Sequence, residues 1–355
     1  MHSQPIPLED ELALSFLGRF AQLNGLPSIG DALESIKVHM PPAKRHPCIW
    51  HLAEICSLNQ AEFSNKHSML PVMYPISRYG ESTKEVSSRR QHALSAGLKT
   101  PENGIRWCPE CHSQDMKMRG FAHWRRRHQL NGIRWCIDHK VSLINTEAES
   151  ILVKPVNFPV PGPALLSACD LEVELRNPTL GRLQRIFLAW LQRPEPYRQQ
   201  AWAAVASARC RDLGLRTGEI GRREVTTDLI REKFPLSWLH RHMPEVAAKP
   251  FGLFVRKVDG ACIDKHIPYP ALACAAILAV LFESSDEALL ALESADKQLS
   301  GAHISENSCD LAVAAFLDGA GFKDACQKFN VGAATVEAAI RTRLLQKSPA
   351  PQLGL

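Results

Sequence analysis

The feature that most constrains this chain is a five-residue repeat, GIRWC, which occurs at 104–108 and again at 132–136. The first copy leads on to Cys111 and the second to His139, so each copy ends in two metal-ligand side chains separated by two residues. A gap of two residues lets a tight turn bring both donors to one ion, and two such knuckles supply the four tetrahedral ligands of a structural zinc site. The sequence therefore predicts one structural Zn2+ bound by Cys108, Cys111, Cys136 and His139.

Other histidines compete for the fourth ligand position, namely His112, His123 and His128. We favour His139 because it takes the place of the second Cys in an otherwise parallel motif. Three thiolates and one imidazole leave no position for water, so the metal is expected to organise structure and not to catalyse hydrolysis. Trp107 and Trp135, which precede the cysteines, are expected to lie on matching strands and to bury a large area in a small module.

The segment between the knuckles is basic. From 100 to 144 there are eight Lys or Arg and four Asp or Glu, a surplus of +4 within a chain whose formal net charge is +5. The residues from Trp124 to Leu130 read as a short helix that carries Arg125, Arg126 and Arg127. An arginine run of this kind either forms a solvated face or contacts phosphates or an acidic partner, and the sequence leaves both open.

Beyond the metal ligands, the segment from 108 to 143 has a recognisable order: CPEC, then Gly and a Trp-Arg stretch, then HQL-x-G, then C-x2-H. This order resembles the TniQ/TnsD family of transposon target-selection proteins. The matching positions are Cys108, Pro109, Cys111, Asp115, Gly120, Trp124, Arg125, His128, Gln129, Leu130, Gly132, Cys136, His139 and Leu143. The segments 5–25 and 51–70 are similar to the family's opening helices, so the resemblance covers about 1–145. The chain lacks the second cysteine cluster of many relatives, which leaves a second zinc in doubt.

The resemblance implies a function in DNA integration. Family members are non-catalytic adaptors that link a targeting element to an AAA+ ATPase, which in turn recruits the transposase. The targeting element is either a DNA site or a CRISPR RNA-guided surveillance complex, and with the latter the family protein acts as a homodimer. We favour the RNA-guided version because the chain is compact. The alternative is an autonomous, sequence-specific, zinc-containing DNA-binding regulator.

The motif content agrees with a non-enzyme, because the sequence has no phosphate loop, HExxH helix or nucleophile elbow. Its longest apolar run, at 271–282, is too short to cross a bilayer. The first residues do not read as a secretory signal. We therefore expect a cytoplasmic protein that does not associate with membranes.

Helical periodicity predicts a mainly α, multi-domain fold with helix-turn-helix units and one small zinc-finger or zinc-ribbon-like module. The expected divisions are 1–80, helical and helix-turn-helix-like; 81–152, linker and zinc finger; 164–300, helical; and 301–347, a C-terminal helix-turn-helix. In the first unit, with its turn at 57–59, a scaffold or docking role is favoured because the second helix has one cation, Lys66. In the last unit, Ala325 marks the helix crossing. Its second helix offers three candidate nucleic-acid or partner contacts, Thr335, Arg341 and Arg343.

Overall fold

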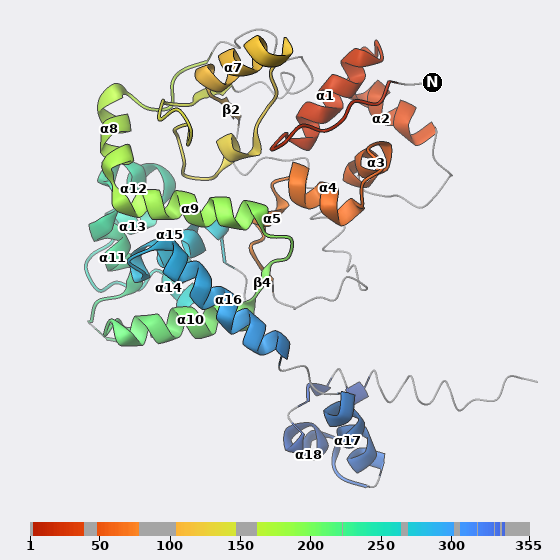
Figure 1. Ribbon diagram of the computed structural model, residues 1–355. Coiled ribbons are helices and arrows are strands. Elements are labelled where there is room, and N and C mark those ends of the chain that lie inside the picture. Colours follow the sequence, from red (N-terminus) through yellow and green to blue (C-terminus); the bar gives the residue numbers. More distant parts are fainter. Residues whose placement is uncertain are drawn as a thin grey trace, which may run out of the picture. The chain divides into compact units, whose positions relative to one another are not determined.

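The computed structural model describes residues 3–38, 48–77, 104–146, 162–221, 223–263, 269–301, 306–317, 319–329, 331–333 and 336–337. Helices dominate these residues, and their strands are short and form two-stranded sheets (Figure 1). The predicted mainly α fold is confirmed. The chain divides into two compact units, Met1–Glu293 and Ser294–Leu355. The finer division into four domains stays a prediction, and its boundary segments 81–103 and 153–161 lie outside the described residues.

The first helices of the larger unit build a core of their own. They are α1 (Ala13–Leu23), α2 (Ile29–Val38), α3 (Cys48–Ile55) and α4 (Gln60–His67). Phe16, Phe20, Leu52 and Phe63 are fully or almost fully buried between them. The helix, turn and helix expected at 51–70 are present as α3 and α4, and the Asn59 side chain caps α4 by accepting a hydrogen bond from Ala61 N at 2.8 Å. Because α4 packs against α9, its inner face serves as scaffold.

Residues 104–146, called here the zinc module, follow the first helices. They contain β2 (Ile105–Trp107), α7 (Pro109–Arg119), the 3-10 turn η1 (Arg126–Gln129) and β3 (Ile144–Thr146). β2 pairs antiparallel with β3, and Trp107 lies opposite Ile144. In the second GIRWC copy, Trp135 forms a single antiparallel bridge with Ser142. The repeat therefore gives one regular strand and one isolated bridge, not two matching strands.

The helix expected from Trp124 to Leu130 is wrong, because only the four-residue turn η1 forms there. The N-terminal segment takes the backbone groups that a longer helix would need: Leu12 N donates to Trp124 O at 2.9 Å, and Trp124 N donates to Ser15 Oγ at 3.1 Å. Arg125 is extended and forms an antiparallel bridge with Glu11. A long-range contact that the local sequence does not contain has overridden the helical pattern.

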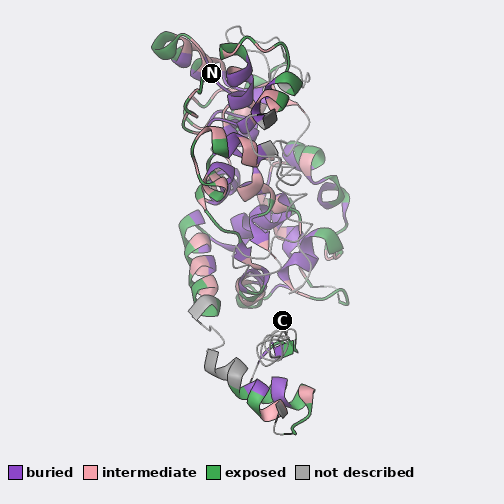
Figure 2. Cartoon of the chain, turned by 90° about the vertical axis from the view of Figure 1, so that its right-hand side faces the viewer, coloured by how far each residue is buried: buried purple, intermediate pink, exposed green. Residues whose placement is uncertain are grey.

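The rest of the larger unit is a helical layer around α15 (Ala271–Leu281), in which every residue from Leu272 to Leu281 is buried. α15 packs against α9 (Pro178–Gln192), α10 (Gln199–Asp212), α11 (Thr226–Lys233) and α14 (Arg256–Asp259). In Figure 2, buried residues gather in the middle of the larger unit. The remaining elements are α5 (Leu70–Met73), β1 (Ile76–Ser77), α8 (Ala168–Arg176), β4 (Tyr197–Arg198), α12 (Leu236–His242), α13 (Pro244–Ala248) and η3 (Gly260–Cys262). The helix α16 (Ser285–Gly301) begins in the larger unit and ends in the smaller one.

The C-terminal end of α15 is closed by cations. Arg182 Nε donates to Ala279 O at 2.7 Å, Arg209 Nε to Leu281 O at 2.8 Å and Lys233 Nζ to Val280 O at 3.5 Å. These groups satisfy carbonyls that have no partner inside the helix and oppose the negative end of its dipole. Over the described parts of the chain, no helix is long and apolar enough to cross a membrane.

The smaller unit contains α17 (Glu306–Leu317) and α18 (Phe322–Lys328), which pack together around Ala312, Val313 and Cys326. Ala325, predicted to lie at the helix crossing, is 1% exposed. Val331 and Val336 belong to the same core. The three contact candidates Thr335, Arg341 and Arg343 lie outside the described residues, as does most of the expected second helix.

Candidate metal centre

The four predicted zinc ligands lie together in the structure. Cys108 is the N-cap of α7 and Cys111 lies in its first turn, whereas Cys136 and His139 come from a tight turn in which Lys140 N donates to Cys136 O at 2.9 Å. Cys136 N donates in turn to Val141 O at 2.8 Å, which closes the hairpin. One ligand atom from each of the four residues lies within 4.8 Å of all the others.

The distances between these donors fit a single tetrahedral ion. His139 Nδ1 lies 3.5 Å from Cys108 Sγ, 3.3 Å from Cys111 Sγ and 3.5 Å from Cys136 Sγ, and the Cys111 and Cys136 sulfurs are 3.7 Å apart. Zinc bonds are about 2.3 Å long to sulfur and about 2.0 Å long to nitrogen. In a tetrahedral site these lengths place a sulfur about 3.5 Å from the nitrogen and two sulfurs about 3.8 Å apart. The three cysteines are buried, so Cys108, Cys111, Cys136 and His139 can hold one metal ion in a closed site.

The other three histidines have different surroundings. The His112 ring packs edge-on against Trp107, with 5.5 Å between ring centroids, and His123 Nδ1 lies 3.2 Å from Asp115 Oδ2. His128 is nearer to the centre, with Nε2 3.7 Å from both Cys111 Sγ and Cys136 Sγ. Burial lowers the pKa of His128, although its hydrogen bond with Cys136 acts in the opposite direction.

The second nitrogen of His139 also has a partner, because its Nε2 lies 2.8 Å from the Gln114 amide on α7. When Nδ1 binds a metal, Nε2 carries the ring proton and needs an acceptor. The amide nitrogen of Gln114 faces the ring, and turning the carboxamide by half a turn brings its oxygen there as the acceptor. Sequence reasoning did not find Gln114, since one glutamine on a helix gives no signal of this role.

The two GIRWC copies are both buried and both begin with a glycine in the left-handed region. Gly104 has φ +84° and Gly132 has φ +75°. A Cβ on Gly132 would lie 2.8 Å from Trp238 Cζ2, and Trp238 Nε1 donates to Gly132 O at 2.8 Å. The two copies also contact each other, since Arg106 NH1 donates to Ile133 O at 3.0 Å. The repeat therefore fixes the zinc module to α12 as well as holding the ligands.

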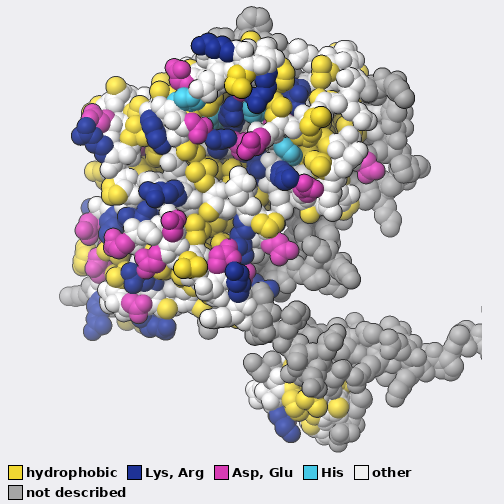
Figure 3. Space-filling model, viewed as in Figure 1, with side chains coloured by type: hydrophobic (Ala, Val, Ile, Leu, Met, Phe, Trp, Pro, Cys, Tyr) yellow, Lys and Arg dark blue, Asp and Glu magenta, His cyan; other side chains and the backbone are white. Residues whose placement is uncertain are grey.

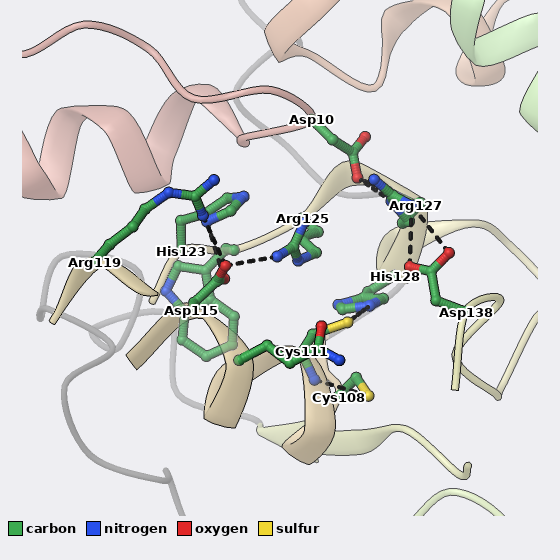
Figure 4. A network of polar contacts seen from close by, with 12 residues as sticks. Asp10, Cys108, Cys111, Asp115, Arg119, His123, Arg125, Arg127, His128 and Asp138 are labelled. Atoms are coloured by element: carbon green, nitrogen blue, oxygen red, sulfur yellow. Dashed lines mark hydrogen bonds and ion pairs between the residues drawn. The ribbon is translucent and has the colours of Figure 1, made fainter. Parts of the chain in front are cut away.

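The three consecutive arginines have different partners, and Figure 4 shows two of them, Arg125 beside Asp115 and Arg127 beside Asp10 and Asp138. Arg125 NH2 donates to Asp115 Oδ1 on α7 at 2.8 Å. Arg127 Nε donates to Asp10 Oδ2 at 2.8 Å, and its NH1 to Asp138 Oδ2 at 3.0 Å. These bonds tie the N-terminal segment and both halves of the zinc module to the turn.

Arg126 is 2% exposed and bonds only to backbone carbonyls. Its Nε donates to Ser68 O at 2.9 Å, its NH2 to Leu191 O at 3.0 Å, and its NH1 to Lys66 O. Burial lowers the pKa of this guanidinium to about 10, although Asp10 acts in the opposite direction. The side chain joins the end of α4 to the end of α9. It is not available to a nucleic acid or a partner, whereas contact by Arg125 and Arg127 stays a prediction.

Asp115 is the acceptor at the centre of this network. Asp115 is 3% exposed, and its carboxylate bonds Arg119 NH1 and Arg125 NH2, both at 2.8 Å. Burial opposes ionisation of Asp115, but His123, Arg125 and Arg119 together hold its pKa below the ordinary value. The Gln129 amide plays a similar part next to it, accepting from Arg106 N at 3.0 Å and donating to Arg106 O at 2.7 Å.

The N-terminal part of the chain, including the zinc module, is similar to a known family. The TniQ family model matches residues 3–143, which span the N-terminal helices and the zinc module. No curated protein matches the chain. The TniQ family is a non-catalytic accessory of transposition with a role in target selection. The resemblance to this family is therefore confirmed, and the chain carries a TniQ domain over residues 3–143.

Proposed function

We propose that this protein is a target-site-selection adaptor of a transposon, which links a targeting element to an AAA+ ATPase that recruits the transposase. The observation that carries the proposal is that the TniQ match over 3–143 coincides with the metal centre and the segments fixed to it. A closed Cys3His site organises structure and offers no open position for catalysis. The chain is then expected to act by presenting surfaces and not by chemistry.

Within this proposal, Zn2+ bound by Cys108, Cys111, Cys136 and His139 would cross-link the two knuckles. The arginines at η1 hold the neighbouring elements. Arg127 bonds the N-terminal segment, Arg126 bonds the ends of α4 and α9, and Arg125 bonds α7. Trp238 and Gly132 fix the other side of the zinc module to α12. We expect these contacts to keep the zinc module in place against α4, α9 and α12 when a partner binds.

For the targeting element, we propose the RNA-guided surveillance complex, with the protein acting as a homodimer, and we keep a direct DNA site as the competing version. Two observations support this choice. Arg125, Arg126 and Arg127 have partners within the chain. On the face shown in Figure 3, Lys and Arg are interspersed with Asp and Glu and do not gather into one basic stripe. Strong binding of a duplex depends on many cations that face the phosphates together.

The test combines affinity capture with a binding measurement. The tagged chain is captured from cells that carry its natural gene neighbourhood, and the proteins and RNA that accompany it are identified by mass spectrometry and sequencing. We expect the AAA+ ATPase and an RNA–protein complex, together with weak binding of the purified chain to duplex DNA and a shallow salt dependence.

The opposite pattern would show an autonomous DNA-binding regulator: tight binding to one duplex with a steep salt dependence, and no ATPase in the captured material. Tight duplex binding together with the ATPase would keep the adaptor but replace the RNA-guided complex with a DNA site.

A further inference from the structure

We propose that His128 is a positioning residue of the metal centre, which donates its Nε2–H to the thiolates of Cys111 and Cys136 and so ties the turn η1 to the metal. This inference rests on the proposed zinc site. It assigns to His128 a role distinct from that of the four ligands.

The geometry places a donor against two acceptors. His128 Nε2 lies 3.7 Å from Cys111 Sγ and 3.7 Å from Cys136 Sγ, and the His128 side chain is 2% exposed. Thiolate sulfur accepts hydrogen bonds at such lengths, and Nε2–H is present in the Nε2 tautomer of the neutral ring and also in the imidazolium. Within the described parts of the chain, the donor group that fits one ion consists of Cys108, Cys111, Cys136 and His139. His128 therefore lies next to the site and outside it.

The charge of the centre explains why a donor is favourable there. Three thiolates and one Zn2+ leave a net charge of −1, and the three cysteines are at most 3% exposed, so little water reaches them. A buried anion needs donors from the protein, and hydrogen bonds to metal ligands hold the ligands in place and tune their basicity. His128 faces two of the three sulfurs and is well placed to supply this bond.

The position of His128 in η1 gives the bond a consequence beyond the metal. On either side of it, Arg127 bonds Asp10 in the N-terminal segment, and Gln129 bonds both backbone groups of Arg106 in β2. The turn is thus held by the metal centre on its inner side and holds the first helices on its outer side. Without the N–H···S bonds, the turn would lose its direct polar contact with the centre.

The test uses Co2+ in place of zinc in the full-length chain, because the energy of the thiolate-to-cobalt charge-transfer band reports hydrogen bonding to sulfur. His128→Phe keeps an aromatic ring and removes the donor, whereas His128→Gln restores an N–H at nearly the same distance from the backbone. His112→Phe is the matched control, since His112 packs against Trp107 away from the sulfurs.

We expect one Co2+ per chain in all four proteins. The charge-transfer band should shift to longer wavelength in His128→Phe and return toward wild type in His128→Gln, while His112→Phe leaves it unchanged. Zinc affinity should fall about tenfold in His128→Phe, as is usual when a partner of a metal ligand is lost. If the Phe variant does not fold, His128→Leu provides the same comparison.

Two results would overturn the inference. An unchanged band in the donor-free variant would show that no N–H···S bond exists. Loss of metal in His128 variants, with metal retained in His139→Ala, would show that His128 is the fourth ligand. A wild-type chain that binds neither cobalt nor zinc would instead contradict the metal centre itself. The experiment therefore distinguishes the absence of a metal site from the absence of a bond from His128.

Discussion

Adjacent residues of the arginine run have unlike environments, which the run itself does not reveal. Arg126 is almost completely buried among carbonyls, while the Arg127 side chain is 26% exposed and bridges Asp10 and Asp138. Arginine suits this work because its planar group presents several donors in fixed directions. The partners come from segments far away in sequence, so the pattern RRR alone cannot distinguish an internal junction from a phosphate-binding face.

Replacing Asp115 should show how much the network around it contributes. Asp115→Asn removes the charge that Arg119 and Arg125 share, and we expect the free energy of unfolding to fall by about 2 kcal/mol, less than for a fully buried pair because the Arg119 side chain is 39% exposed. Because the pKa of Asp115 is lowered, this contribution is complete above the ordinary carboxyl range and is lost only as the pH falls through the folded-state value.

The measurement is urea unfolding at pH 7.5. The control is Glu172→Gln, which breaks an exposed ion pair of the same spacing with Arg176 and should change stability by less than about 0.5 kcal/mol. Equal effects of the two substitutions would show that the Asp115 network contributes no more than a surface pair.

At the scale of elements, the zinc module is held on two sides by different means. On one side, polar groups of the N-terminal segment and η1 bond to each other, including Arg126 N to Asp10 O at 2.8 Å. On the other side, Gly132 lies directly against the Trp238 ring of α12, and a close fit joins the hydrogen bond from Trp238 Nε1 to Gly132 O. We therefore make a separate prediction for each of the two contacts.

A methyl group at Gly132 should disturb the contact with α12. Gly132→Ala must accommodate both φ +75° and a Cβ 2.8 Å from Trp238, whereas Gly120→Ala has φ +76° and nothing within 4 Å of its Cβ. We expect the Gly120 substitution to cost about 1 kcal/mol, the usual cost of a side chain in the left-handed region, and the Gly132 substitution to cost at least ~2 kcal/mol. Thermal unfolding of both variants checks this, and a Gly132 effect no larger than that of Gly120 would mean that the module and α12 do not pack this closely.

The polar contact between the N-terminal segment and η1 can be weakened at Asp10. Asn tolerates the backbone of Asp10, whose φ is +60°, so Asp10→Asn removes the charge facing Arg127 and leaves the turn intact. We expect a loss of about 1.5 kcal/mol, as for hydrogen bonds to a charged group, and roughly tenfold faster hydrogen exchange at the amide of Leu12, which bonds Trp124 O. The exposed neighbour Glu9 serves as control, and Glu9→Gln should leave the exchange rate unchanged. Unaltered protection of Leu12 in the Asp10 variant would show that Arg127 does not hold the segment.

At the scale of the whole molecule, the sequence predicts local features well and long-range contacts poorly. The spacing of Cys108, Cys111, Cys136 and His139 was enough to predict that the four donors lie together, because each pair of ligands is set by a few residues around one tight turn. The apolar run at 271–282, which is too short to cross a bilayer, forms the buried helix α15. By contrast, the shortening of the helix at Trp124 and the partners of Arg126 depend on Leu12, Ser15 and Leu191, which no local pattern connects to them.

The two compact units have separate cores, which leads to a prediction about the C-terminal part. Among the residues that the structure describes, the cores of the larger unit end at Leu292 and that of the smaller unit begins at Ala312. A chain that ends after Gly301 should therefore keep its metal, and its main thermal transition should shift by no more than about 2 °C, the change that ~1 kcal/mol causes in a domain of this size. Loss of metal or of the transition would show that the smaller unit supports the larger one.

Metal analysis of the purified protein shows whether the two knuckles close on one zinc ion. Three samples are compared by elemental mass spectrometry: the wild-type chain, Cys136→Ser and His112→Ala. We expect one zinc per chain in the wild type and in His112→Ala, and a substoichiometric content in Cys136→Ser. A wild-type chain without zinc, or a Cys136→Ser chain that retains a full equivalent, would contradict it.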